Sequence, residues 1–229
     1  MPQGFTHPSR RTNFRDRGNS AGSWPTRINQ LERRPMATVS LTTPLTEEVV
    51  RELKAGDQVT ITGTVWGLRD ATLIYWHDGG NDFPADLSDG VLLHTQPNVK
   101  PGPDGRWEPV CIGTTTSQRM DRFTRPLLER LRVKAILGKG GMSGDTAAAM
   151  AEHGCVYLAV VGGAAAVETL QIDEIEEVYW EHLMPECLWR FRVTTLGPLF
   201  VAIDSHGNNL HEEILAQARA RVASLTAGQ

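Results

Sequence analysis

The sequence predicts an α/β fold with a β-rich first half and a second half in which strands alternate with helices. In the first half, between residues 57 and 113, apolar residues alternate with Thr and Gly or form short runs, as they do in strands. From residue 133 onward, near-continuous apolar strands alternate with helical segments. This is the pattern of βαβ units in a mostly parallel sheet that is covered on both faces. No internal repeat is visible, so we expect one domain over residues 36–229.

The first half contains one predicted helix followed by several strands. TEEVVRELKAG at 46–56 is predicted to be helical, because Thr46 can cap it and Gly56 can end it. DQVTITGTVWG at 57–67 alternates apolar and polar residues and is predicted to be a strand. The other β-type segments of this half are LIYWH at 73–77, GVLLHTQ at 90–96 and PVCIG at 109–113, with a Pro/Gly/Asp turn region at 97–105.

The second half shows the alternation most clearly. Its predicted strands are VKAILG at 133–138, CVYLAVVGG at 155–163 and LFVAID at 199–204. Its predicted helices are SGDTAAAMAEHG at 143–154, AAAVETL at 164–170 and HEEILAQARARVASL at 211–225. The last helix is amphipathic, with an apolar side made of Ile214, Leu215, Ala218 and Val222.

The composition is that of an ordinary globular chain, with 229 residues, 40% of them hydrophobic and 22% charged. No apolar run approaches the roughly 18 residues that span a membrane, and no signal-peptide pattern opens the chain. We therefore expect a soluble, cytoplasmic protein without a membrane partner. Cys111, Cys155 and Cys187 are widely separated and the histidines are scattered, so we expect core thiols and no metal site in this chain.

Residues 1–35 differ in kind from the rest. They carry seven arginines against Asp16 and Glu32, a surplus of five positive charges, which leaves the remainder of a chain of net charge −4 near −9. Because they show no hydrophobic period, we expect a disordered basic tail, with Met36 as a candidate native start. A transit peptide or a nucleic-acid-binding arm is the alternative, but an amphipathic helix and interleaved aromatic residues are missing.

The strongest candidate for chemistry is GTTTSQRMD at 113–121. A strand that ends in hydroxyl residues and leads into a helix places hydroxyls and free backbone N–H groups at the edge of a sheet. Ser117 is a natural N-cap, and Arg119 can bind a carboxylate through its forked guanidinium. The segment therefore suits an anion, and the alternative interpretation is a plain capped helix.

Three further segments follow predicted strands. Lys139 lies in GKGG at 138–141, which matches neither a P-loop nor GxGxxG, so a nucleotide is disfavoured and a solvated turn is the alternative. Arg69 and Asp70 could be a surface ion pair, and AIDSHGNNL at 202–210 could be an Asx-type turn. Two arginines, a lysine and a hydroxyl segment at successive sheet ends nevertheless describe a site for a small dicarboxylate.

These motifs, in this order, resemble the β subunit, or C-terminal domain, of iron–sulfur class I fumarases and of L(+)-tartrate dehydratase. The resemblance rests on LTTPL at 41–45, AGDQVTITGTV, Arg69-Asp70-Ala71, GTTTSQRMD, LGKGGM, GGAAAV, EIEEVYWEHLMPECLW and VAIDSHGNNL. It implies a swivelling β/β/α domain that closes over a partner α subunit in an α2β2 assembly. It also implies that the partner carries a [4Fe–4S] cluster, since the cluster cysteines are absent from this chain.

The resemblance assigns roles to seven residues. Thr115 would be the base that removes the proton next to a substrate carboxylate. Binding of the substrate would fall to Arg69, Arg119 and Lys139 at its carboxylates, with Thr116, Ser117 and Gln118 lining the same loop. A threonine hydroxyl is a poor base unless cations and helix-end N–H groups stabilise its alkoxide, and such cations are present.

Two positions depart from the family pattern. The usual Gly-Pro before Thr-Thr-Ser is Gly113-Thr114 here, and Arg-Asp-x-x-His becomes an Arg-Asp-x-x-Leu ending at Leu73, which leaves His77 as the candidate replacement. We expect the β subunit of a hydro-lyase that interconverts fumarate and L-malate, or L-tartrate and oxaloacetate, and that is active only with its α subunit. The alternative is a non-catalytic dicarboxylate-binding or scaffold subunit.

Overall fold

The computed structural model describes residues 36–226, so the predicted tail at 1–35 lies outside the described residues. The strands are β1 (Thr38–Thr42), β2 (Gln58–Leu68), β3 (Val91–His94), β4 (Asn98–Pro101), β5 (Trp107–Cys111), β6 (Ala135–Gly138), β7 (Val156–Ala159), β8 (Glu174–Tyr179) and β9 (Leu188–Ile203). The α-helices are α1 (Glu47–Glu52), α2 (Asp70–Leu73), α3 (Asp121–Leu131), α4 (Gly144–His153), α5 (Ala165–Leu170) and α6 (Leu210–Thr226). Three short helical turns are η1 (Ile74–Asp78), η2 (Ser117–Met120) and η3 (Glu181–Leu183).

Seven of these strands form one sheet in the order β1-β2-β3-β6-β7-β9-β8. β9 also pairs with β2, which closes β2, β3, β6, β7 and β9 into a five-stranded, barrel-like ring. The pairings from β1 through β7 are parallel, whereas β9 runs antiparallel to β2, β7 and β8. The α/β prediction is confirmed, and the sheet is a mixed one because β9 supplies all of its antiparallel pairings.

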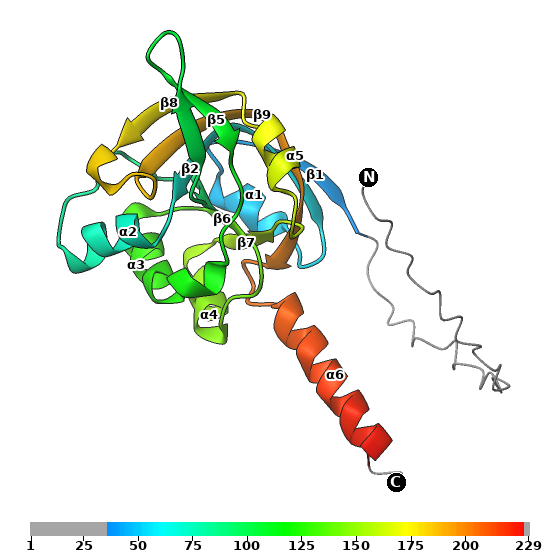
Figure 1. Cartoon of the computed structure of the whole chain (residues 1–229). Helices are drawn as coiled ribbons and strands as arrows, with labels where there is room; N and C mark the ends of the chain where they lie inside the picture. Colours follow the sequence, from blue (N-terminus) through cyan, green and yellow to red (C-terminus); the bar gives the residue numbers. More distant parts are fainter. Residues whose placement is uncertain (1–35, 227–229) are drawn as a thin grey trace, which may run out of the picture. The chain divides into compact units, whose positions relative to one another are not determined.

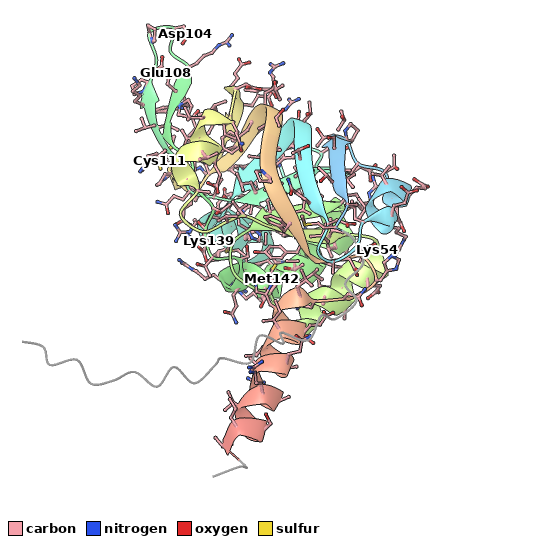
Figure 2. The ribbon with its side chains drawn as sticks, turned by 90° about the vertical axis from the view of Figure 1, so that its right-hand side faces the viewer. Lys54, Asp104, Glu108, Cys111, Lys139 and Met142 are labelled. Atoms are coloured by element: carbon pink, nitrogen blue, oxygen red, sulfur yellow. The ribbon has the colours of Figure 1, made fainter. Side chains whose placement is uncertain are left out.

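β4 and β5 form a separate antiparallel hairpin, so part of the predicted turn region at 97–105 is a strand. The hairpin projects from the ring (Figure 1), and Figure 2 shows Asp104 at its tip. Arg106 pairs with Glu174 of β8 at 2.6 Å. The hairpin returns the chain to the ring at Cys111, immediately before the hydroxyl segment.

Both faces of the ring are buried, which explains the near-continuous apolar strands. Val91 and Leu93 of β3 belong to the core inside the ring, whereas Leu92 belongs to a second core on the outer face. In β7, Val156 points inward and Tyr157 outward in the same way. The second core is completed by residues of α2, α3 and α4, which cover this outer face (Figure 1). Alternation within a strand therefore separates two apolar environments rather than core from solvent.

The predicted β-type segment at 73–77 is wrong, because these residues end α2 and form the π-helical turn η1. Leu73 and Trp76 are buried while Ile74 is 46% exposed. Buried positions three apart lie on one face of a helix, whereas a strand would bury every second residue. The bulky residues that suggested a strand are therefore the inward face of a helical turn.

Two predicted elements of the C-terminal half differ from the structure in extent or packing. LFVAID is only the end of β9, which begins at Leu188 and is 16 residues long. The helix predicted at 211–225 exists as α6, but it has no buried residue and extends away from the sheet (Figure 1). Its apolar side, including Ile214 and Leu215, stays exposed. Among the described residues, no helix combines the length and the apolar character needed to cross a membrane.

The seam between β2 and β9 yields a stability prediction. Gly67→Ala should destabilise the folded chain by about 1–3 kcal/mol, because an added Cβ overpacks a filled core. That Cβ would stand 2.4 Å from the Phe191 ring and 2.9 Å from the Thr95 methyl group. Gly162→Ala is the matched control, since a Cβ there meets nothing within 4 Å. Urea unfolding measures the stability of both variants. Equal unfolding midpoints would show that the seam accommodates an added Cβ without strain.

Candidate functional site

The hydroxyl loop, residues 113–117, passes between the carboxyl ends of β3 and β6. The backbone N–H of Thr115 donates to the carbonyl of His94 at 2.7 Å, and that of Ser117 donates to the carbonyl of Lys139 at 3.1 Å. Thr116 and Lys139 form a parallel bridge. The structure thus brings the hydroxyl loop and the glycine segment around Lys139 together at one edge of the ring.

Ser117 points into the protein and is fully buried, so the prediction that it caps a helix is wrong. Thr116 occupies the N-cap position of η2 and makes no capping bond with its side chain. The Ser117 hydroxyl instead lies 2.9 Å from Nδ1 of His94 and 3.1 Å from the Tyr157 hydroxyl. The Tyr157 hydroxyl also bonds the carbonyl of Gly140 at 3.0 Å. A buried chain of polar groups therefore fastens the hydroxyl loop to β3 and to the glycine segment.

Gly138, the last residue of β6, is required by this arrangement. A Cβ at this position would stand 1.7 Å from Oγ of Ser117 and 3.1 Å from the Tyr157 hydroxyl. Gly138, the first glycine of GKGG, thus makes room for the protein's own serine. The positive backbone angle of this segment falls two residues later, at Gly140, with φ of 76°.

Thr114 is also buried, but the other side chains of the loop and of the two residues after it are accessible. Thr115 is half-buried, whereas Thr116, Gln118 and Arg119 are exposed. Within the described part of the chain, the hydroxyls of Thr115 and Thr116 make no hydrogen bond. These hydroxyls are therefore available to a ligand, unlike that of Ser117.

The two arginines meet at one carboxylate. Arg69 follows β2, and its Nε lies 2.9 Å from Oδ2 of Asp70 and 3.6 Å from Oε1 of Glu186. It also donates to the side-chain oxygen of Gln96. Arg119 reaches the same Asp70 oxygen at 3.1 Å, although its side chain is 53% exposed. Asp70 therefore holds both guanidinium groups in place.

Lys139 completes the set of cations and lies on the same side of the ribbon as Cys111, the last residue of β5 (Figure 2). It is half-buried, and no carboxylate of the described residues lies within salt-bridge distance of its ammonium. The positive charge of Lys139 is free of a direct ion pair, whereas that of Arg69 is not.

Three buried residues of this region were missed by sequence reasoning: His94, Tyr157 and Glu168. The sequence pattern could have indicated His94, because it is a polar residue at the carboxyl end of a buried strand. Tyr157 lies inside an apolar strand and Glu168 inside a short helical segment, where neither stands out. Glu168 is 5% exposed and accepts the backbone N–H of Thr114 at 3.0 Å.

Two candidates from the sequence lie elsewhere. The His77 ring packs against Phe123 with ring centroids 5.9 Å apart, and among the described residues it makes no hydrogen bond, ion pair or ring contact with the hydroxyl loop. The segment at 202–210 is an Asx-type turn: Asp204 accepts the backbone N–H groups of His206 and Asn208 at 3.0 and 3.1 Å. This turn leads into α6 rather than into the site.

The cysteines do not suit a metal or an iron–sulfur cluster. No group of three potential ligands is assembled among residues 36–226. Burial raises the pKa of Cys155 and of Cys187 to about 12, which favours the thiol over the thiolate that a metal needs.

His94 gives the site a pH-dependent contribution to stability. Burial lowers the pKa of its imidazole from 6.5 to about 3, so the ring stays neutral in the folded chain. The unfolded chain takes up that proton at the ordinary pKa. The stabilisation is therefore complete above the unfolded pKa and is lost as the pH falls towards the folded one.

We accordingly predict that the free energy of unfolding falls with decreasing pH between these two pKa values, with His94 contributing about 1.4 kcal/mol per pH unit. His94→Gln keeps a polar side chain beside Ser117 but cannot titrate, so its slope should be smaller by that amount. Urea unfolding at several pH values measures both slopes. Equal slopes would show that His94 is protonated in the folded chain.

Comparisons with known proteins show the family of this chain. A family model described as fumarase C-terminus matches residues 15–214. The L(+)-tartrate dehydratase subunit beta of Escherichia coli K12 is 39% identical over 174 residues, covering 76% of this chain and 86% of the relative. The corresponding Shigella sonnei subunit is 38% identical over the same shares. A Geobacillus stearothermophilus protein provisionally named fumarate hydratase class I is 40% identical over 177 residues, 77% of this chain and 34% of that protein. The chain therefore belongs to the fumarase C-terminus family, together with these L(+)-tartrate dehydratase β subunits.

Proposed function

We propose that this chain is the catalytic β subunit of a hydro-lyase that removes water from, or adds it to, a four-carbon dicarboxylate. Fumarate with L-malate, or L-tartrate with oxaloacetate, is the proposed substrate pair. The observation that carries the proposal is the position of the unbonded Thr115 hydroxyl, in a loop bridged to Lys139 and leading to Arg119. The names of the most similar relatives support the same reaction class.

In the proposed reaction, Thr115 acts as an alkoxide and takes the proton from the carbon next to a substrate carboxylate. The electron pair of that C–H bond forms the new double bond as the neighbouring C–O bond breaks and hydroxide leaves. With L-tartrate this step gives the enol of oxaloacetate, which tautomerises to the ketone; hydration of fumarate is the reverse of the step. Nearby cations stabilise the Thr115 alkoxide. They also stabilise the negative charge that develops next to the substrate carboxylate during proton removal. Lys139 supports Thr115 directly, because its backbone N–H donates to the Thr115 carbonyl at 3.4 Å.

The substrate carboxylates are proposed to bind the cations of the site. Lys139 and Arg119 are the accessible ones, and the guanidinium of Arg119 can grip a carboxylate in a bidentate manner. Arg69 would join them by exchanging a contact with Asp70, Gln96 or Glu186 for the substrate. We propose that this exchange accompanies closure of the swivelling domain over its partner.

Loss of the substrate hydroxyl group needs a Lewis acid, and we assign that chemistry to a [4Fe–4S] cluster held by a partner α subunit. The described residues of this chain do not fit such a cluster. The β-subunit names of the relatives support a partner, and we propose an α2β2 assembly. On this proposal the chain is inactive alone and is assayed in complex with the α subunit, anaerobically, on fumarate and on L-tartrate.

Thr115→Ala should lower kcat of the assembled complex by a factor of about 10² to 10⁴, because the proposed base is removed. Thr115→Ser keeps a hydroxyl and should retain much of the activity. Thr38→Ala, on an exposed position of β1, is the control for a threonine outside the site. Turnover by Thr115→Ala at the wild-type rate would exclude this threonine from proton transfer.

Arg119→Met should raise KM for the dicarboxylate by about ten- to a hundredfold, the loss expected for a hydrogen bond between charged groups. Arg122→Met is the matched control, since Arg122 lies three residues later and pairs with Asp78 at 2.6 Å instead. Steady-state kinetics of the assembled complex separate KM from kcat. A similar KM for both variants would remove Arg119 from carboxylate binding.

One observation favours the alternative, a non-catalytic dicarboxylate-binding or scaffold subunit. Leu73, which stands where the resembling family has a histidine, is fully buried in the second core. No imidazole can reach the site from that position. Binding of malate or tartrate by the assembled complex without turnover would support this alternative and contradict the catalytic proposal.

A further inference from the structure

A buried carboxylate lies behind the hydroxyl loop. Glu168 of α5 is 5% exposed, and its Oε2 accepts the backbone N–H of Thr114, the residue before the proposed base. No lysine or arginine of the described residues lies within salt-bridge distance of it. Acidic side chains are seldom buried without a direct ion pair, so this position calls for a physical reason.

Residues 112–114, which lead from β5 into the hydroxyl loop, fix the position of this carboxylate. Ile112 donates its backbone N–H to the Thr169 hydroxyl at 2.8 Å, and Thr114 donates to Glu168 at 3.0 Å. Between them, a Cβ on Gly113 would stand 2.7 Å from Cβ of Ala165. Helix α5 therefore lies close against residues 112–114, and the Glu168 carboxylate is held at one position behind the hydroxyl loop.

The charge of Glu168 is coupled to that of Lys139. Burial raises the pKa of the Glu168 carboxyl, while the hydrogen bond from Thr114 and the positive charge of Lys139 act in the opposite direction. Glu168 lines a small cleft whose other lining residues are apolar or uncharged: they come from the end of β7, from α5 and from β9, and include Val160, Gln171 and Leu196. Within the described chain, Lys139 is the charged group whose field acts on this carboxyl.

We propose that Glu168 is a positioning residue that holds the Thr114–Thr115 segment and sets the effective charge of the Lys139 side of the dicarboxylate site. The inference rests on the proposed function, because it concerns how that site attracts a dianion. An ionised Glu168 offsets the ammonium of Lys139, and a protonated one leaves it uncompensated. The affinity for the dianionic form of the substrate should therefore weaken as the pH rises through the pKa of Glu168.

The first test uses Glu168→Gln in the complex assembled with the α subunit. The amide oxygen can still accept the Thr114 N–H, but the negative charge is gone. KM for the dicarboxylate should fall by about three- to tenfold at a pH where Glu168 is ionised, the size expected for one screened charge. The pH dependence of KM should flatten, and kcat should change less than KM.

Two further variants separate charge from packing. Glu168→Leu removes the acceptor as well, so it should lower kcat through a misplaced Thr115, whereas Glu168→Gln should not do so to the same extent. Glu152→Gln is the matched control, because Glu152 is an exposed acid paired with Arg125 at 2.7 Å. A Glu168→Gln complex with the KM and pH profile of the wild type would overturn the proposal.

A second measurement needs no turnover. Carboxyl-carbon NMR of the full chain follows the titration of Glu168 in the wild type and in Lys139→Met. Removal of the positive charge should shift the Glu168 titration to higher pH, and an unchanged titration would overturn the coupling. If neither fumarate nor tartrate is turned over by any complex, the proposed function fails, and this titration still decides whether Glu168 and Lys139 are coupled.

Discussion

Strand β9 is the element on which the arrangement of the site depends. It runs antiparallel to β2 along one edge and to β7 and β8 along the other, and it is the pairing with β2 that closes the ring. Closure brings the carboxyl ends of four parallel strands to one rim. Arg69 follows β2, His94 ends β3 and Lys139 follows β6, so residues far apart in sequence become neighbours there. β2, β3 and β6 are paired side by side in parallel, so these residues lie at adjacent strand ends of the rim.

Close approach of backbones, made possible by glycine, is the second constraint. Gly138 makes room for the Ser117 hydroxyl, Gly113 for helix α5, and Gly67 for the Phe191 ring. Each of these contacts involves a segment that carries a candidate functional group or leads to one, and it fixes that segment against the ring or, at Gly113, against α5. The site is consequently rigid on its inner side, where Ser117, His94 and Tyr157 bond one another, and open on its outer side, where Thr115 and Arg119 lie.

The charges of the site follow the same division. Cations lie at the rim, and two of them already share Asp70, so a bound carboxylate competes with an internal one. Behind the loop, Glu168 lies in mostly apolar surroundings, where burial raises the pKa of its carboxyl. On the proposed function, such a site would attract a dianion without leaving three uncompensated positive charges close together. A bound carboxylate would then compete with Asp70 for the two guanidinium groups.

The sequence by itself determined the α/β class, the helix capped by Thr46, most strands of the ring, and the segments that meet at the rim, because apolar periodicity and turn residues are local properties. Only the tertiary structure decided which hydroxyl points inward, that residues 73–77 are helical, and that α6 buries no residue. It also revealed His94, Tyr157 and Glu168. The reason is physical: burial, ring closure and the pKa of a buried group depend on neighbours supplied by distant parts of the chain, and no local pattern records them.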